Sequence, residues 1–178
     1  MITGIKRDMF ELVGKGSFST VYRKSEKEVL IFSNDKVKEC MSLGFFPSCR
    51  LFPKVINTNN TILEKPVYTM KYYKKVSSLK NTLEPKEYSF YKELRKLYND
   101  NLCIGYNNLY KLFNSLPSKY KYKKSLLLNA LNGLINYGDD MRFEISPRNV
   151  TVNNGKLILL DCFYFSSQLE EVKRKRKY

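Results

Sequence analysis

Apolar and polar residues alternate through the first third of the chain, and this pattern predicts short strands. β-branched and aromatic residues gather in three runs separated by turns of Gly, Ser and Lys, at 10–13, 20–23 and 28–32. Such runs between turn residues are typical of strands that pack on one face. Two further strands are expected within 51–56 and 61–70, around the polar turn 57–60. The pattern therefore predicts a five-stranded antiparallel sheet.

The middle of the chain changes to helical spacing, with apolar residues three or four positions apart. Helices are expected over three long segments and, briefly, over one short one: 84–100, 105–116, 121–137 and 35–44. Gly138 is expected to end the last long helix. Asn154-Gly155 between two apolar runs then predicts a hairpin. We therefore expect an α+β protein whose two parts are joined near residues 71–80.

Composition limits the classes of protein that fit. The chain has 178 residues, of which 43% are hydrophobic, enough for a packed core in one domain or two small lobes. It contains no apolar run long enough to span a membrane and no apolar leader at its start. Four cysteines lie far apart, which argues against a zinc site and a disulfide scaffold. A reducing cytoplasm is the expected location.

The chain contains no histidine. This excludes hydrolysis by a Ser-His-Asp triad and zinc chemistry that depends on histidine ligands. Phosphoryl transfer stays open, because it works mainly by positioning and by metal-assisted neutralisation of charge.

The formal net charge is +15, from 32 Lys and Arg against 17 Asp and Glu. Such a charge favours acidic partners, including nucleic acid, acidic protein surfaces and nucleotides. The codon bias of an AT-rich genome would also give many lysines, so both explanations stay open. Two basic runs, 119–124 and 173–177, have the same two interpretations: solvated lysines, or contact with nucleic acid or an acidic protein.

The most informative stretch is 13–22, which has two glycines one residue apart, an aromatic residue and a Val-Tyr pair. It resembles the glycine-rich loop of protein kinases. The resemblance implies that a hairpin covers the phosphates of ATP, with Val21 against the base. The loop residues implied are Val13, Gly14, Lys15, Gly16, Ser17, Phe18 and Val21. An ordinary Gly/Ser hairpin is the alternative.

A second resemblance lies in segment 142–163. Protein kinases place a catalytic Asp five residues before an Asn, then a hairpin, then a metal-binding Asp. Glu144, Asn149 and Asp161 occupy these positions here. The resemblance implies that Glu144 accepts the proton of the acceptor hydroxyl and that Asn149 and Asp161 hold Mg²⁺ on the phosphates.

A third segment, 68–73, lies midway between the other two and resembles the hinge strand of protein kinases. The resemblance implies that Met70 limits the back of the adenine pocket and that Lys71 and Tyr72 give backbone hydrogen bonds to the base. An ordinary amphipathic strand is an equal alternative for this segment alone.

Two departures concern the nucleotide. Ser19 stands where the loop usually has a third glycine, and Phe32, with Ile31 beside it, stands where the third strand should end in the phosphate-pairing lysine. A lysine from elsewhere would have to substitute, and the candidates are Lys15, Lys24, Lys36 and Lys38. Glu39 is either the carboxylate partner of such a lysine or a solvated helix residue.

Three further departures concern catalysis. Glu144 is one methylene longer than Asp, and a displacement of about 1 Å can cost about 100-fold in rate. Cys162-Phe163 replaces Phe-Gly, and only a short tail follows residue 165, so the activation segment and most of the helical C-lobe are missing. Asp139 and Asp140 are expected to be helix caps or solvated charges.

Together these segments resemble the protein-kinase-like fold over about 150 residues. The resemblance implies an N-lobe over 1–72, a reduced helical C-lobe over 73–165 and a basic tail over 166–178. More narrowly, the chain resembles the early host-takeover serine/threonine kinases of short-tailed bacteriophages. That implies ATP and Mg²⁺ as cofactors, a host protein as substrate and the host cytoplasm as location. A pseudokinase that only binds, a nucleic-acid-binding protein and a small-molecule phosphotransferase remain alternatives.

Overall fold

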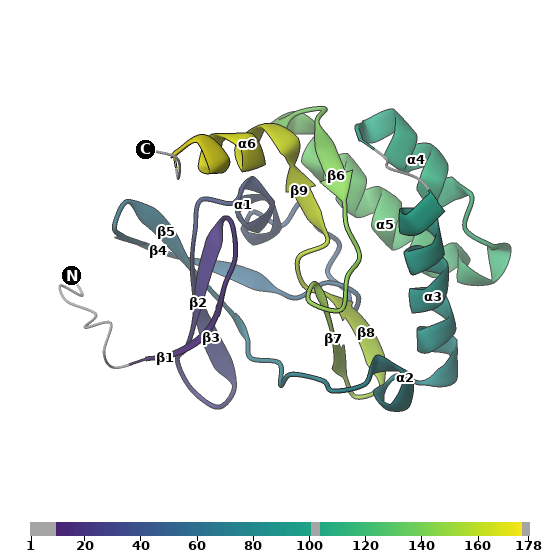
Figure 1. Ribbon diagram of the computed structural model, residues 1–178, viewed down its shortest axis with the longest axis horizontal. Helices are drawn as coiled ribbons and strands as arrows, with labels where there is room; N and C mark the ends of the chain where they lie inside the picture. The colour runs from purple at the N-terminus through teal and green to yellow at the C-terminus, as the bar shows by residue number, and fades with distance from the viewer. Residues whose placement is uncertain (1–9, 101–103, 176–178) are drawn as a thin grey trace.

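The N-terminal part of the chain forms an antiparallel sheet (Figure 1), seen in a computed structural model that describes residues 10–100 and 104–175. The sheet has five strands in the order β1-β2-β3-β5-β4. Their bounds are β1 Glu11–Lys15, β2 Ser19–Arg23, β3 Glu28–Ser33, β4 Val55–Ile62 and β5 Lys65–Lys71. The predicted five-stranded antiparallel sheet is confirmed.

The β4–β5 turn differs from the sequence prediction. The polar residues 57–60 lie inside β4, where the register shifts in a bulge, and the turn is made by Leu63 and Glu64 with positive φ of 51° and 61°. Thr58 explains part of this, because its hydroxyl donates to the Val67 carbonyl at 2.8 Å across the bulge. β4 is an edge strand, and mostly exposed edge positions tolerate polar residues.

The two faces of the sheet have unequal partners. Val29, Ile31 and Tyr68 join the main hydrophobic core, which they share with the helices. A smaller cluster on Leu30, Phe32 and Val67 covers the other face, with Phe10, Tyr22 and Ile62 packed around it. The large core therefore lies between the sheet and the helical part, where alternation along β3 places Val29 and Ile31.

The predicted helices are confirmed, with small changes at their ends. They are α1 Lys36–Ser42, α3 Pro85–Asp100, α4 Tyr106–Asn114 and α5 Lys121–Leu134, and a short α2 Leu79–Thr82 precedes α3. A 3-10 turn, Ile135–Tyr137, extends α5 up to Gly138, whose φ is +141°. The chain between β5 and α2 crosses from the sheet to the helices (Figure 1).

Two small strand pairs complete the helical part. The predicted hairpin is present as β7 Val150–Asn153 and β8 Lys156–Leu159, and its turn places Asn154 at φ 50° and Gly155 at φ 73°. A second pair, β6 Met141–Phe143 with β9 Phe163–Phe165, was not predicted. Strands of three residues carry too few positions for periodicity to reveal them.

The basic segment after residue 165 is a helix, α6 Ser166–Lys175, and not the tail that the sequence predicted. Two hydrogen bonds to other segments hold its first turn. Asp140 accepts from the Ser167 N–H, and the Gln168 amide donates to the Asn34 carbonyl. Lys173, Arg174 and Lys175 form the last turn, where cations stabilise the helix dipole. The last part of the predicted run, residues 176–178, lies outside the described residues.

The observed architecture is α+β, as predicted. Across the described ranges, no helix has the length and apolar character needed to cross a membrane. The lobe boundaries at 72 and 165 remain predictions.

Candidate functional site

The glycine hairpin is open rather than strained. Gly14 lies in β1 and Gly16 in the turn, where the Gly16 N–H donates to the Ser19 carbonyl at 2.8 Å. A Cβ built on Gly14 would meet nothing within 4 Å, and one built on Gly16 would meet the Ser19 carbonyl oxygen at 3.9 Å. Neither glycine has a positive φ. These glycines therefore leave space beside the backbone and are not demanded by the turn.

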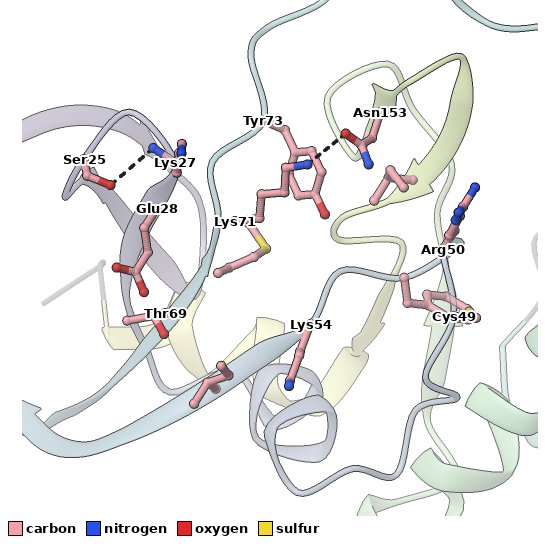
Figure 2. A pocket seen from close by; sticks show the side chains of 14 residues that line it. Ser25, Lys27, Glu28, Cys49, Arg50, Lys54, Thr69, Lys71, Tyr73 and Asn153 are labelled. Atoms are coloured by element: carbon pink, nitrogen blue, oxygen red, sulfur yellow. Dashed lines mark hydrogen bonds between the residues drawn. The ribbon is translucent and has the colours of Figure 1, made fainter.

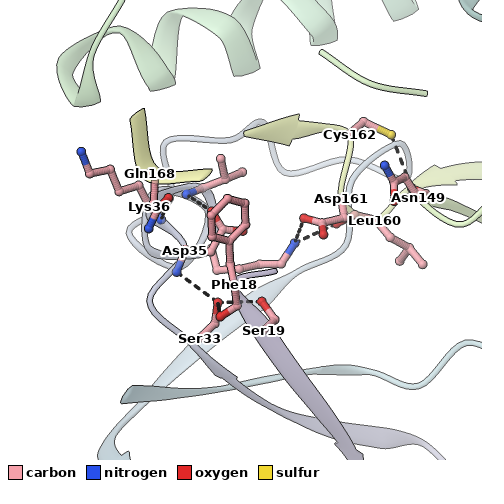
Figure 3. Close-up of polar contacts among 12 residues, drawn as sticks. Phe18, Ser19, Ser33, Asp35, Lys36, Asn149, Leu160, Asp161, Cys162 and Gln168 are labelled. Atoms are coloured by element: carbon pink, nitrogen blue, oxygen red, sulfur yellow. Dashed lines mark hydrogen bonds and ion pairs between the residues drawn. The ribbon is translucent and has the colours of Figure 1, made fainter. Parts of the chain in front are cut away.

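Ser19, which replaces the third glycine, ties the hairpin to the strand behind it. Its hydroxyl lies 2.7 Å from the Ser33 hydroxyl, which also donates to the Phe18 carbonyl at 3.3 Å. Ser33 is fully buried and accepts from the Asp35 N–H at 3.1 Å. The departure from the kinase pattern therefore has a structural role, since it connects the loop tip to the start of α1 (Figure 3).

The other predicted loop residues differ in exposure. Val13 is exposed, while Val21 is half-buried and packs against the main core. Phe18 is also half-buried. Val21 is paired across the sheet with Ile31, which joins the main core, while Phe32, the residue aligned with the kinase lysine, belongs to the smaller cluster on the other face. Val21 and Ile31 therefore form an apolar surface at this point of the sheet.

The segments that carry the three predicted catalytic residues meet through backbone hydrogen bonds. The Asn149 carbonyl accepts from the N–H groups of Leu160 and Asp161 at 2.8 and 3.3 Å, so the backbones of the two predicted metal ligands are adjacent. The Glu144 N–H donates to the Cys162 carbonyl at 2.8 Å, which places Glu144 beside the same turn. Arg95 of α3 supports this segment by donating to the Ile145 carbonyl at 2.6 Å.

Asp139 and Asp140 have the capping role that the sequence suggested. Asp139 Oδ1 accepts from the Tyr106 N–H at 3.0 Å at the start of α4, and Asp140 accepts from the Ser167 N–H at the start of α6. Both carboxylates are therefore engaged in holding helices.

Of the four candidate lysines, Lys38 is the one that reaches the predicted metal ligand. Its Nζ donates to Asp161 Oδ1 at 3.0 Å and to the Leu160 carbonyl at 2.9 Å (Figure 3). Lys38 lies on α1 and is 5% exposed. Lys24 is paired with Glu28 at 2.7 Å, Lys15 is exposed, and Lys36 lies 5.7 Å from the Phe165 ring. The sequence could propose Lys38 but could not choose it.

Lys38 keeps its charge despite its burial. Burial alone would lower the pKa of the ammonium, but the carboxylates of Asp161 and Asp35 outweigh it and hold the pKa above its ordinary value. A buried cation is tolerated only when it is paired and hydrogen-bonded. The fold therefore presents a fixed positive charge next to Asp161.

The second carboxylate in this group, Asp35, is a residue that sequence reasoning missed. It is 1% exposed and caps α1, with Oδ1 accepting from the Val37 N–H at 2.9 Å. No hydrogen-bond partner of Oδ2 is present among the described residues. The pKa of Asp35 is raised to about 6, because burial, together with the nearby Asp161 charge, outweighs the opposing effects of Lys38 and the Val37 N–H. The available signal was an Asp immediately before a helix, three residues ahead of Lys38.

Glu39, the carboxylate considered in the sequence analysis, is exposed. This agrees with its interpretation as a solvated helix residue. Asp35, and not Glu39, is the α1 carboxylate whose charge acts on Lys38.

Helix α1 is held against the helical part by close packing. A Cβ on Gly133 of α5 would lie 2.3 Å from the Phe45 carbonyl oxygen, so only glycine fits there without a backbone shift. The Cys40 thiol of α1 donates to the Gly133 carbonyl at 3.3 Å. Lys38 is therefore placed by a helix that cannot move freely.

The predicted hinge residues differ in what they can offer a base. The Tyr72 N–H already donates to the Lys27 carbonyl at 2.8 Å, so a backbone contact from Tyr72 to a base would have to use its carbonyl. Lys71 Nζ donates to Asn153 Oδ1 at 2.9 Å and thereby connects β5 to the β7–β8 hairpin. Met70 is half-buried against the core.

The donor set fits a magnesium ion held partly by a substrate. Among the described residues no three acidic, cysteine or histidine side chains are grouped to hold a metal. Magnesium is commonly bound by one or two carboxylates together with substrate phosphates. The Asp161 side chain is 49% exposed beside the Asn149 backbone, which suits such a partly formed site.

Comparisons with known proteins do not identify a family for this chain. No protein-family model matches the chain, and a search of curated proteins gives no match. Among solved structures, it is similar to the GDP and kanamycin complex of the aminoglycoside phosphotransferase APH(2")-IIia, at 10% identity and a TM-score of 0.44, over 99% of this chain and 80% of that one.

A second structure is the streptomycin-ATP-APH(2")-IIa ternary complex, at 16% identity and a TM-score of 0.37, over 88% of this chain and 66% of that one. At identities and TM-scores this low, neither likeness assigns a family or a function. The functional argument therefore stands on the site itself.

Proposed function

We propose that this chain is an ATP- and Mg²⁺-dependent phosphotransferase in which Lys38 replaces the phosphate-pairing lysine missing from β3. The observation that carries the proposal is the buried Lys38 ammonium, 3.0 Å from Asp161 and within the field of Asp35. A cation fixed beside a metal-binding carboxylate is what stabilisation of transferred phosphate requires.

The glycine loop, the predicted metal ligands and the predicted base each have a role in this proposal. The hairpin from Val13 to Val21 covers the phosphates, and its glycines leave room for close approach. Asp161 and Asn149 would hold Mg²⁺, and the ion would supply neutralisation of the phosphate charge. Lys38 is shared between Asp161 and the phosphate oxygens.

Glu144 is the proposed base. The acceptor hydroxyl oxygen forms a bond to the γ-phosphorus while the bond to the leaving ADP oxygen breaks, and the hydroxyl proton passes to the Glu144 carboxylate. Its position beside the Cys162 carbonyl supports the role, because this turn also carries Asp161.

The proposed acceptor is a serine or threonine of a protein, as the resemblance to phage kinases implies, with a host protein as target. The net charge of +15 supports an acceptor segment rich in acidic residues. It disfavours a polycationic acceptor, which the same charge would repel.

A second candidate is a pseudokinase that binds nucleotide without transferring phosphate. The observation that favours it is the Lys38–Asp161 ion pair itself, because the lysine occupies an oxygen that a metal ion would otherwise use. The Glu144 side chain, one methylene longer than Asp, also favours a pseudokinase, because a displaced base would slow transfer.

The test is Mg²⁺-dependent transfer from γ-labelled ATP, with wild type beside Asp161→Asn. Autophosphorylation and an acidic serine-containing peptide serve as acceptors, and an aminoglycoside and a neutral sugar test a small-molecule acceptor. Label incorporated by wild type but not by Asp161→Asn supports the proposal, and the labelled acceptor identifies the substrate class. Binding of ATP without any transfer supports the pseudokinase, and absence of both contradicts the proposal.

A further inference from the structure

A cavity of about 600 Å³ lies beside the end of β5 (Figure 2). We call it the hinge pocket. Its sides are the β4–β5 pair, the segment before β4 and the β7–β8 hairpin, represented by Lys71, Tyr73, Cys49, Lys54 and Asn153. Its volume is typical of pockets that hold small organic ligands. Its described lining includes none of the glycine-loop residues, nor Lys38 or Asp161.

The hinge pocket carries an excess of positive charge. Lys27, Arg50, Lys54 and Lys71 line it, and all four are exposed. Among its described lining residues the one carboxylate is Glu28, whose Oε2 is already 2.7 Å from Lys24 Nζ. Four exposed cations around one cavity, with a single carboxylate among its described lining residues, attract anions.

The rest of the lining is apolar or aromatic. Phe52, Ile56, Met70 and Ile158 contribute apolar surface, and Tyr73 stands across the cavity from Cys49 (Figure 2). A small inorganic anion would leave this surface in contact with water, whereas a flat apolar body would cover it. The ligand that matches both parts is therefore an anion with an aromatic group.

We propose that the hinge pocket binds an organic phosphate with an aromatic body. The pocket shares Met70 and Lys71 with the predicted base site, but not the glycine loop, Lys38 or Asp161 of the proposed phosphate site. The phosphate contacts the cations at the mouth, and the ring lies against Phe52, Met70 and Tyr73. This proposal is independent of the proposed phosphotransferase activity.

The position of the pocket gives such a ligand a route to the proposed active site. Its lining comes from both the sheet and the β7–β8 hairpin, which Lys71 and Asn153 already connect by a hydrogen bond of 2.9 Å. Met70 belongs both to this lining and to the residues packed on the main core. A bound ligand would therefore restrict movement between the two parts of the molecule.

Cys49 provides a direct reporter of occupancy. It is a half-buried free thiol in the lining, whereas Cys40 and Cys162 are buried. The experiment measures the rate at which iodoacetamide alkylates Cys49, assigned by peptide mass spectrometry, without ATP or Mg²⁺. The probes are 1-naphthyl phosphate, 1-naphthol and inorganic phosphate. At about ten times its dissociation constant, 1-naphthyl phosphate should slow Cys49 alkylation about tenfold by mass action.

The other two probes and two variants decide the cause of protection. At the same concentration, 1-naphthol and inorganic phosphate should protect Cys49 far less. The double variant Arg50→Glu, Lys54→Glu should lose the protection. The matched double variant Lys96→Glu, Lys111→Glu makes the same change in net charge at exposed positions on α3 and α4 and should keep it.

Three outcomes overturn the proposal: no protection by 1-naphthyl phosphate, equal protection by 1-naphthol, or protection that survives the Arg50→Glu, Lys54→Glu change. If that double variant does not fold, added salt tests the charge in wild type, because screening should weaken protection by the phosphate and leave protection by naphthol unchanged. A salt-independent effect would also overturn it. None of these results bears on transfer from ATP.

Discussion

The two sides of the proposed nucleotide site are built in opposite ways. On the α1 side, Asp35 and Lys38 are almost fully buried, and Gly133 leaves no room for a side chain. On the hairpin side, Gly14 faces open space and Val13 is exposed. The fixed charge therefore comes from the closely packed side, while the phosphate cover comes from the side with room to adjust.

This difference explains how the site can lack a third-strand lysine. A lysine on β3 would project from the same sheet that carries the glycine hairpin. Lys38 is instead carried by a helix packed on α5, and the hairpin reaches that helix only at its start, through Ser19 and Ser33. If this account is right, changes on the α1 side should be costly and changes in the hairpin should be mild.

The largest effect is expected for Lys38→Met. Loss of the buried ammonium should lower the rate of phosphoryl transfer by about 100- to 1000-fold, the usual effect of losing one preorganised group that stabilises transition-state charge. Steady-state transfer from labelled ATP measures it. Lys96→Met, at an exposed position of α3, is the control and should keep wild-type activity. Equal activity in both variants would contradict the claim that Lys38 supplies the fixed charge of the site.

Asp35→Asn should change how stability depends on pH. Because the pKa of Asp35 is raised from 3.8 to about 6, the folded protein binds this proton more tightly than the unfolded chain. Protonation therefore stabilises the fold as pH falls from about 7 towards 4, by up to about 3 kcal/mol. Asp35→Asn should lose this contribution while its side-chain oxygen still caps α1.

Urea unfolding of wild type and Asp35→Asn at pH 5 and pH 7.5 measures the difference. The free energy of unfolding should favour wild type more at pH 5 than at pH 7.5. A difference that does not vary with pH would show that Asp35 is not perturbed by its burial.

Gly133→Ala should destabilise the protein by about 1–3 kcal/mol, the usual cost of overpacking a closed site. The new Cβ would lie 2.3 Å from the Phe45 carbonyl oxygen, and backbone atoms cannot turn away as a side chain can. Thermal unfolding measures the change. A variant as stable as wild type would mean that α1 and α5 are not held as closely as the contact indicates.

Gly14→Ala should have the smallest effect, with stability within about 0.5 kcal/mol of wild type, as for a substitution that disturbs no packing. Its new Cβ meets nothing within 4 Å, and its φ is not in the left-handed region. If the same variant weakens ATP binding in a calorimetric titration, the space beside Gly14 is occupied by bound ATP. Unchanged affinity would argue that the loop does not approach phosphate.

Sequence patterns found the parts of the fold that repeat over enough residues. The five strands, the long helices and the Asn154-Gly155 hairpin follow from periodicity and turn chemistry. The pair β6–β9 is too short for periodicity. Helix α6 was missed because its basic residues suggest a solvated arm, while the contacts that hold its first turn, from Ser167 to Asp140 and from Gln168 to Asn34, join distant positions.

In the candidate site, some residues could likewise be proposed from the sequence and others could not. Glu144, Asn149 and Asp161 could be proposed from spacing, because the hairpin between the last two fixes their distance. Lys38 could only be one of four candidates, since its contact with Asp161 joins positions 123 residues apart. Asp35 was missed because an Asp before a helix is usually only a cap, and its burial depends on packing from distant segments.

The most direct test of the central claim uses an acyl phosphate of ATP. A lysine next to the bound phosphates attacks the acyl carbonyl, forms an amide at Nζ and releases ATP. Peptide mass spectrometry then identifies the labelled lysine. The account predicts that Lys38 is acylated and that excess ATP prevents it. Labelling of another lysine that ATP protects, with Lys38 unmodified, would contradict the account.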